Sequence, residues 1–252
     1  MIRLSMVRKS YGSKEVLKDV TLEVRKRELL CLVGPNGSGK TTTLNVVAGL
    51  CLPNGGTVLI NDVLMDGRTG NRVVHVNPSE RKIGYVFQDY ALFPHMTVRE
   101  NVSYGLKARH MPKCDVKERT QKLLEFVGLL DHSKHYPHQL SGGQKQKTAL
   151  ARALAIEPEI LLLDEPLSAL DWRTRESLRV ELKRILGSLE VTSIYVTHEL
   201  AEAYEVSDRI AVMGPGRIEQ TGSRDEVFSK PNEYAAQFFG QKSYNGNDST
   251  SV

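Results

Sequence analysis

The chain has 252 residues, 40% hydrophobic and 25% charged, so it is long and apolar enough to form a packed globular core. Its 34 basic and 30 acidic residues leave a formal net charge of +4, a mild excess that does not by itself indicate nucleic-acid binding. No stretch approaches about 18 uncharged apolar residues, which excludes a membrane-spanning helix. Three scattered cysteines without a CxxC pair indicate reduced thiols in a cytosolic protein.

Short β-type runs alternate with helical patterns along most of the chain. The β-type runs are at 2–7, 20–24, 28–34, 56–60, 83–88, 159–166, 192–198 and 209–214. The apolar periodicity predicts helices at 40–50, over much of 97–130, and at 173–189. Because apolar strands without alternation are buried on both faces, this order predicts a parallel sheet covered by helices. The block from about 90 to 155 is expected to form a helical subdomain, and polar residues 241–252 are predicted to be a disordered tail.

A glycine-rich loop in "CLVGPNGSGKTT" has the spacing of a phosphate-binding loop, G-x-x-x-x-G-K-[ST], from Gly34 to Thr41. Glycines let several backbone N–H groups face one phosphate, Lys40 can reach the β- and γ-phosphates, and the Thr41 hydroxyl suits Mg²⁺. An apolar strand precedes the loop and a helix follows it, which disfavours a glycine turn with a stray lysine. The predicted nucleotide-contacting residues of the loop are Gly34, Pro35, Asn36, Gly37, Ser38, Gly39, Lys40, Thr41 and Thr42.

Two adjacent acidic residues end the apolar strand "ILLLDEP". Asp164 stands at the carboxyl end, where ligands bind in open α/β sheets, and can hold Mg²⁺. Because neighbouring side chains on a strand point different ways, Glu165 can address a water while Asp164 serves the metal. The alternative is a capped strand end with two solvated acids, which the nearby phosphate loop makes less favourable.

Three further residues carry weaker signals. Gln88 ends the run "IGYVFQ", and its amide can bind a metal-side water, although for this residue alone a solvated strand end is the better explanation. His198 ends "TSIYVTH" and can donate to a γ-phosphate oxygen, although a histidine after a strand is more often structural. Tyr11 in "KSYG" can stack on an adenine ring, or is merely an aromatic beside a glycine turn.

The stretch "LSGGQKQKTALARAL" begins an amphipathic helix and has two interpretations. Ser141 and Gln144 have the spacing of a capping box, S-x-x-Q. However, Gly142 and Gly143 weaken a helix that needed only a cap, so they indicate a close approach of the backbone to something else. Asp171, in "SALD", is a further polar turn shortly after the acidic pair.

In chain order, the motifs "KSYG", "GPNGSGKTT", "VFQD", "LSGGQ", "LLLDEP", "SALD" and "VTHE" together resemble the nucleotide-binding subunits of ATP-binding cassette (ABC) transporters. The resemblance covers about residues 2–240. It implies an α/β fold: a P-loop NTPase ABC ATPase core with a parallel sheet, an N-terminal antiparallel β subdomain and a helical subdomain, in one ABC ATPase domain at 1–240. It also implies ATP and Mg²⁺ as cofactors. The implied catalytic residues are Glu165, His198 and Gln88, and the implied Mg²⁺ ligands are Thr41, Gln88 and Asp164.

Cassettes of this family pair head to tail, so the resemblance implies an ATP-sandwich homodimer. Ser141 and Gly143 of one copy are then expected to bind the γ-phosphate held by Lys40 of the other. The implied nucleotide contacts outside the phosphate loop are Tyr11, Ser141, Gly142, Gly143, Gln144 and Asp171.

Within the family, "GYVFQDYALFPHMTVRENVSYGL" and "DRIAVMGPGRIEQTGSRDEVFSKP" resemble the ATPases of binding-protein-dependent importers, and the segment 63–88 is most similar to importers of molybdate, tungstate or sulfate. The implied partners are integral membrane permease subunits and, indirectly, a substrate-binding protein, with no nucleic acid. The implied location is peripheral, on the cytoplasmic face of the cell membrane. The apolar run 92–96 is where the family docks its membrane subunit, although core packing explains it equally well.

Two other functions stay open from the sequence: a soluble ABC ATPase acting on nucleic acid or ribosomes, and a nucleotide-dependent scaffold without turnover. The chain also departs from the family. Arg27 replaces the usual glycine, which predicts a reshaped turn, and Lys147 and Thr148 replace the usual arginine and valine. No C-terminal regulatory domain is expected. His132, His135 and His138 do not favour a zinc site, because Pro137 breaks their alignment and no carboxylate or cysteine completes a ligand set.

Overall fold

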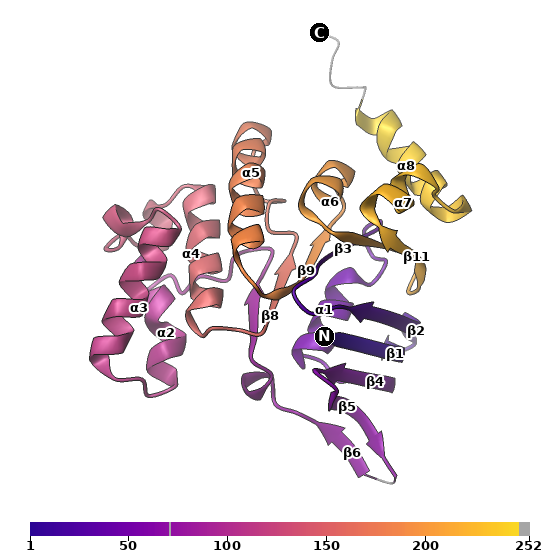
Figure 1. The fold of residues 1–252 in the computed structure, drawn as a ribbon, viewed down its shortest axis with the longest axis horizontal. Helices are drawn as coiled ribbons and strands as arrows, with labels where there is room; N and C mark the ends of the chain where they lie inside the picture. Colours follow the sequence, from indigo (N-terminus) through magenta and orange to yellow (C-terminus); the bar gives the residue numbers. More distant parts are fainter. Residues whose placement is uncertain (71, 247–252) are drawn as a thin grey trace. The chain divides into compact units, whose positions relative to one another are not determined.

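The computed structural model describes residues 1–70 and 72–246 (Figure 1). The chain divides into two compact units, the first made of Met1–Arg81 together with the described residues from Thr192 onward, and the second of Lys82–Val191. The phosphate loop therefore belongs to the first unit, whereas the motifs "LLLDEP" and "LSGGQ" belong to the second.

An antiparallel sheet with strand order β2-β1-β4-β5-β6 forms the N-terminal part of the first unit. Its strands are β1 (Ile2–Tyr11), β2 (Lys14–Val24), β4 (Gly55–Ile60), β5 (Val63–Thr69) and β6 (Arg72–His75). Ile2, Leu4 and Val7 of β1 are buried between more exposed neighbours, as in a sheet with one face on the core. The expected antiparallel β subdomain is confirmed, but β5 and β6 were not predicted because charged residues interrupt their short apolar runs.

The first unit also contains parallel strands. β3 pairs in parallel with β9 on one side and β10 on the other, and β11 is antiparallel beside β10. The bounds are β3 (Leu29–Val33), β9 (Thr192–Thr197), β10 (Arg209–Met213) and β11 (Ile218–Ser223). Every residue of β9, and all but the first of β3 and β10, is buried, as the continuous apolar runs predict.

Helix α1 (Lys40–Ala48) starts directly after the phosphate loop, and the buried side chain of Arg81 holds its other end. Nη1 of Arg81 donates to the carbonyls of Val46 (3.2 Å) and Val47 (3.0 Å), the last turn of the helix. The same nitrogen lies 2.9 Å from Oδ2 of Asp66, and both side chains are fully buried. A Cβ at Gly49, where α1 ends with a φ of 77°, would lie 2.5 Å from the guanidinium, so only glycine leaves room for this arrangement.

The second unit combines a parallel strand pair with four α-helices. Its elements are β7 (Ile83–Val86), α2 (Val98–Ala108), α3 (Lys113–Phe126), α4 (Gly142–Ala155), β8 (Ile160–Asp164) and α5 (Trp172–Ser188). Figure 1 shows α2, α3 and α4 gathered together, and they share one apolar core. The helical pattern predicted over 97–130 is thus two helices packed on each other, and the expected helical subdomain is confirmed within the described part of the chain.

The C-terminal part of the first unit has three helices that the periodicity did not predict: α6 (Leu200–Val206), α7 (Arg224–Ser229) and α8 (Glu233–Gly246). Residues 241–246 of the predicted disordered tail are therefore helical, whereas 247–252 lie outside the described residues. No helix in the described ranges has both the length and the apolar character needed to cross a lipid bilayer. Arg27 adopts a φ of 60°, the left-handed conformation that glycine favours.

Candidate functional site

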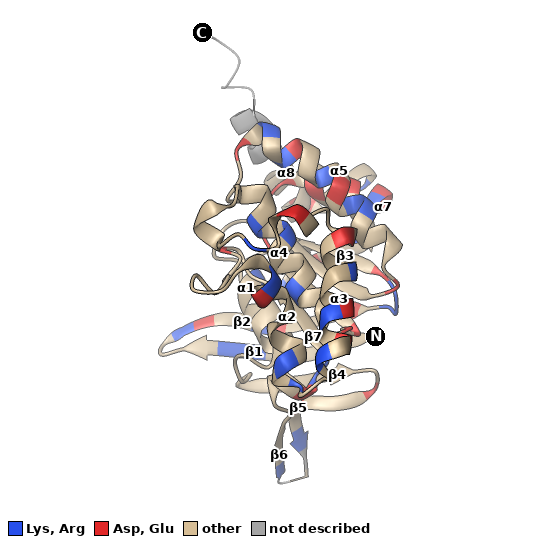
Figure 2. Cartoon of the chain, turned by 90° about the vertical axis from the view of Figure 1, so that its left-hand side faces the viewer, with Lys and Arg blue, Asp and Glu red and all other residues tan. Residues whose placement is uncertain are grey.

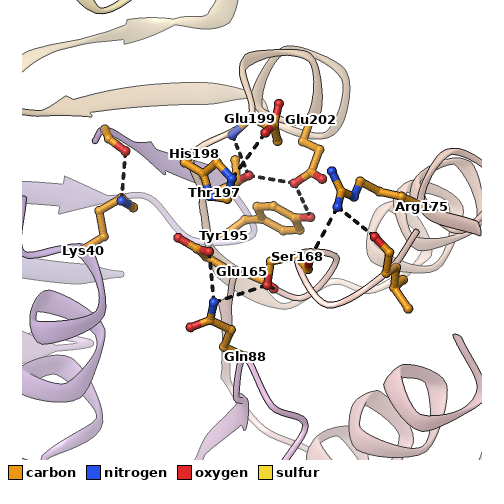
Figure 3. A network of polar contacts seen from close by, with 12 residues as sticks. Lys40, Gln88, Glu165, Ser168, Arg175, Tyr195, Thr197, His198, Glu199 and Glu202 are labelled. Atoms are coloured by element: carbon orange, nitrogen blue, oxygen red, sulfur yellow. Dashed lines mark hydrogen bonds and ion pairs between the residues drawn. The ribbon is translucent and has the colours of Figure 1, made fainter. Parts of the chain in front are cut away.

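The phosphate loop of the first unit curls around the side chain of Lys40. Lys40 is only 5% exposed, and its Nζ donates to the carbonyls of Gly34 and Pro35, each at 2.9 Å (Figure 3). Gly37 and Gly39 have φ values of 80° and 109°, which side chains with a Cβ rarely adopt. The loop backbone thus depends on its glycines, and the lysine ammonium is held inside the curl that they create.

The start of α1 is open to an anion. No side chain caps the helix, whose N-cap residue is Gly39, and its first turn has no acidic residue. Free N–H groups at a helix start attract negative charge. In addition, the Ser38 hydroxyl is buried and has no hydrogen-bond partner among the described residues. A phosphate oxygen satisfies both features, so the loop fits the phosphates of a nucleotide.

Tyr11 lies beside the C-terminal end of the phosphate loop. Its ring is 51% exposed, and Nζ of Lys9 lies 5.0 Å from the ring centroid. Partial burial and the neighbouring Cys51 raise the pKa of the Tyr11 hydroxyl, while a hydrogen bond with Thr42 acts in the opposite direction. The structure therefore brings two sequence-predicted residues, Tyr11 and Thr42, into contact.

His198 follows β9 in the first unit, and a buried carboxylate fixes the turn that carries it. Oγ1 of Thr197 and Oη of Tyr195 donate to Oε2 of Glu202 at 2.8 and 3.2 Å (Figure 3). The amide of Glu199 donates to Oγ1 of Thr197 at 3.0 Å, and Nε2 of His198 lies 3.3 Å from a Glu199 carboxylate oxygen. Glu202 was missed in the sequence, because an acid in the helix that follows a strand usually faces solvent.

In the second unit, Gln88 and Glu165 contact each other directly. Nε2 of Gln88 donates to Oε2 of Glu165 at 3.3 Å and to Oγ of Ser168 at 3.4 Å (Figure 3). The Ser168 hydroxyl in turn donates to the carbonyl of Glu165 at 2.8 Å. Ser168 is a site residue that sequence reasoning missed; its place in "SALD", shortly after the acidic pair, was the available signal.

Asp164 and Glu165 have different environments, as predicted for adjacent residues at a strand end. Asp164 is 3% exposed, and Oη of Tyr85 donates to it at 3.4 Å. Glu165 adopts a φ of 44°, a strained conformation for a residue with a long side chain. Carboxylate and amide oxygens suit Mg²⁺, so the chemistry of Asp164 and Gln88 in this unit is that of Mg²⁺ ligands.

The motif "LSGGQ" (140–144), called the signature below, shows both a capping box and a close approach of its glycines to other residues. Ser141 caps α4: its hydroxyl accepts from the Gln144 amide at 3.3 Å, and Oε1 of Gln144 accepts from the Ser141 amide at 2.9 Å. The capping box is confirmed. A Cβ at Gly142 would lie 2.5 Å from a methyl group of Leu170, and one at Gly143 would lie 2.6 Å from a methyl group of Leu178, so a larger residue at either position requires the leucine to move.

The three histidines before the signature do not gather into one cluster. Nε2 of His132 lies 3.1 Å from Nε2 of Gln144, and its Nδ1 lies 3.0 Å from Nδ1 of His135. His138 instead stacks on Tyr136, with ring centroids 5.9 Å apart. His132 thus contacts the side chain of Gln144 in the signature.

Asp171 acts as the N-cap of α5. Its carboxylate accepts from the Thr174 amide at 3.1 Å, and the hydrogen bonds with Thr174 lower the pKa of Asp171. On the same helix, Glu181 pairs with Lys147 of α4 at 2.7 Å, so lysine is readily accommodated where the family usually has arginine.

Within the run 92–96, Phe93 packs against neighbouring side chains while Pro94 and His95 are exposed to solvent. Phe93 lies 4.7 Å from the Tyr104 ring, centroid to centroid, and 5.4 Å under the Arg152 guanidinium, whereas Pro94 and His95 are exposed. Core packing therefore explains Phe93 but not its two neighbours.

Comparison with known proteins gives close relatives over nearly the whole chain. A family model described as ABC transporter matches residues 17–168. The sulfate/thiosulfate import ATP-binding protein CysA of Nocardia farcinica is 48% identical over 241 residues, covering 95% of this chain and 70% of the relative. The protein of the same name from Mycobacterium bovis is 49% identical over 233 residues, covering 92% and 64%. That from Thermosynechococcus vestitus is 46% identical over 230 residues, covering 91% and 66%.

Solved structures agree with this match. An ATP-binding cassette solved as a dimer in a post-hydrolysis state, bound to ADP and Pi, has a TM-score of 0.76 and 33% identity, covering 89% of this chain and 99% of the other. A protein from Clostridium perfringens described as part of an ABC transporter complex has a TM-score of 0.79 and 27% identity, covering 91% and 90%.

Proposed function

The chain belongs to the ABC transporter family, and on that basis we propose that it is the ATP-hydrolysing subunit of an importer that takes up a small oxyanion through separate membrane subunits. The phosphate loop carries this proposal. Buried Lys40, the uncapped start of α1 and the unsatisfied hydroxyl of Ser38 together suit nucleotide phosphates better than any other ligand.

Binding of the nucleotide is assigned mainly to the first unit. Lys40 and the loop amides hold the phosphates, Tyr11 stacks on the adenine, and His198 donates to a γ-phosphate oxygen. Thr41, together with Asp164 and Gln88 of the second unit, is the proposed ligand set for Mg²⁺, which neutralises phosphate charge when bound.

Glu165 is the proposed general base. Its carboxylate accepts the proton of the attacking water, and the amide of Gln88 orients that carboxylate by its hydrogen bond of 3.3 Å. Phosphoryl transfer needs mainly positioning and charge neutralisation, so these few side chains suffice for turnover.

The signature is proposed to act on a second copy of the chain. Ser141 and Gly143 of one copy contact the γ-phosphate bound by Lys40 of the other, with Gly142, Gln144 and Asp171 shaping the contact. The dimeric state of a similar cassette supports this arrangement. A mixed dimer with one Ser141→Arg chain tests it: turnover is lost at the Lys40 site of the unmodified chain, and loss at the modified chain's own Lys40 site contradicts the proposal.

Sulfate or thiosulfate is the proposed cargo, ahead of molybdate or tungstate, because the similar relatives are named for sulfate and thiosulfate import. The partners are permease subunits that dock on 92–96 at the cytoplasmic face of the membrane and, indirectly, a substrate-binding protein. Exposed Pro94 and His95 support this docking segment.

The decisive experiment isolates the tagged chain from its native membranes and reconstitutes the complex in liposomes. Co-purification of an integral membrane subunit, and ATP-dependent uptake of labelled sulfate that Lys40→Ala abolishes, are the expected results. Excess thiosulfate is expected to compete with sulfate more strongly than excess molybdate. Co-purification of nucleic acid or ribosomes without a membrane subunit contradicts the importer role and favours a soluble ABC ATPase.

A further inference from the structure

A cavity of about 450 Å³ lies between α2 and α3 of the second unit, on residues that no nucleotide motif uses. This volume is within the range of pockets that hold small organic ligands. The cavity has a basic rim and an apolar wall, which together define what it can bind.

The rim carries four cations, Arg99, Lys107, Lys113 and Lys117, against one lining carboxylate, Glu100. None of the four side chains forms a hydrogen bond or a close ion pair among the described residues. Glu100 is already engaged, because its Oε2 accepts from both the amide and the hydroxyl of Thr97 at 2.8 Å. Hydrogen bonds from Thr97, with a smaller contribution from Lys107, lower the pKa of Glu100, so one of the four cations already faces a carboxylate and the rim keeps a net positive charge.

Other charges of α3 are balanced locally, which separates the rim from an ordinary solvated helix face. Basic and acidic residues alternate along α3 (Figure 2). Lys122, which does not line the cavity, pairs with Glu118 one turn away at 2.6 Å. The unpaired cations of this helix are those that face the cavity.

The wall is apolar apart from one hydroxyl that lacks a partner. Met111 and Val116 line it, as does Thr120, which is only 1% exposed. Oγ1 of Thr120 has no hydrogen-bond partner among the described residues, whereas the other lining hydroxyl, that of Ser103, donates to the carbonyl of Glu100 at 3.2 Å. A buried hydroxyl left unpaired destabilises a protein, and a ligand oxygen that accepts its proton removes this cost.

We propose that this cavity binds a small organic anion, whose sulfonate, sulfate or phosphate group contacts the basic rim while its apolar part lies against Met111 and Val116. Oγ1 of Thr120 donates a hydrogen bond to the bound molecule. The four cations select for the anionic group, and the wall selects against a bare inorganic ion. This binding does not depend on ATP hydrolysis.

The probe is 1-naphthalenesulfonate, which is titrated into the full chain in the presence of excess ADP. Binding is measured by NMR from the ¹³C-methyl signals of the protein's six methionines. We expect a saturable shift at Met111 and none at Met213, which lies beside the phosphate loop at Gly34. Neutral 1-naphthalenesulfonamide tests the charge and is expected to bind about tenfold more weakly, and inorganic sulfate, which tests the apolar wall, is expected to leave the Met111 signal in place. Equal affinity for the sulfonamide, equal affinity for sulfate, or a shift confined to other methionines overturns the proposal.

Matched variants locate the contacts. Lys107→Gln with Lys117→Gln is expected to weaken binding of the sulfonate about tenfold, whereas Lys122→Gln with Lys183→Gln removes the same charge elsewhere and leaves affinity unchanged. Thr120→Val keeps the side-chain shape and is expected to weaken binding severalfold without lowering the urea midpoint. The proposed site is contradicted if the Lys107 and Lys117 double variant binds the sulfonate as tightly as the wild-type chain. It is also contradicted if the Lys122 and Lys183 double variant loses as much affinity as the first.

Discussion

Nε2 of Gln88 lies 3.3 Å from Oε2 of Glu165, so a residue two positions after β7 is hydrogen-bonded to the residue that directly follows β8, the strand paired with β7. Glu165 is additionally held at a φ of 44°. A carboxylate oriented both by its backbone and by a neutral donor keeps its direction, which a base that acts on a positioned water requires.

Glu165→Gln is expected to retain ATP binding and lower hydrolysis by about two to four orders of magnitude, because the amide fills the same space but cannot accept a proton. Phosphate release measures turnover, and size-exclusion chromatography with ATP measures dimer formation, which is expected to increase. Turnover near that of the wild-type chain rules out Glu165 as the base.

Ser38→Ala separates ligand binding from folding. The Ser38 hydroxyl is buried without a partner among the described residues, so its removal is expected to leave the thermal midpoint of the nucleotide-free chain unchanged or slightly higher. ATP affinity is expected to fall by about threefold to tenfold through loss of one hydrogen bond to phosphate. Calorimetric titration measures the affinity. A lower midpoint with unchanged affinity would show that the hydroxyl serves the fold.

Arg81→Met tests the anchor of α1. It leaves the buried Asp66 carboxylate with only the His75 imidazole beside it (Nδ1 to Oδ1, 2.6 Å) and is expected to reduce the free energy of unfolding by about 3–5 kcal/mol, measured by urea denaturation. The double variant Arg81→Met with Asp66→Leu removes both charges and is expected to recover most of that loss. If both variants are equally unstable, the ion pair is not the cause and packing around Arg81 is.

Asp171→Asn tests the charge of the α5 cap without removing its oxygen acceptor. Hydrogen bonds with Thr174 lower the pKa of Asp171 from its ordinary value of 3.8, so the unfolded chain binds this proton more readily than the folded one. The cap's charge therefore contributes stability above pH 3.8, and this contribution is lost as the pH falls through the lowered pKa. Wild-type thermal midpoints are expected to fall more steeply than those of the variant in that acidic range; parallel curves contradict the assignment.

Local motifs were predictable where the sequence itself fixes the geometry. The strand, loop and helix around Lys40 follow from glycine spacing, and the capping box from Ser141 and Gln144 three residues apart. The partners of Gly142 and Gly143 were not predictable, because Leu178 of α5 and Leu170 of the turn before α5 reach them only through tertiary packing on α4.

Tertiary contacts in the first unit could not be predicted from the sequence either. Asp66 and Arg81 stand in a polar segment that resembles a loop, yet they form a fully buried pair once β5 and β6 fold back on each other. Strand β11 consists mostly of polar residues, so neither the strand nor its pairing with β10 could be predicted from apolar periodicity. Ser168 and Glu202 were missed for the same reason, since each gains its role from neighbours that the fold supplies.

The hydrogen bonds from Arg81 to the last turn of α1 affect the free energy of nucleotide binding. A helix fixed at its C-terminal carbonyls presents its N-terminal amides in one position before any nucleotide arrives. Little conformational entropy of the phosphate loop is then lost when it binds a nucleotide, which favours affinity. Loosening this remote ion pair is therefore expected to weaken nucleotide binding without altering any side chain of the phosphate loop.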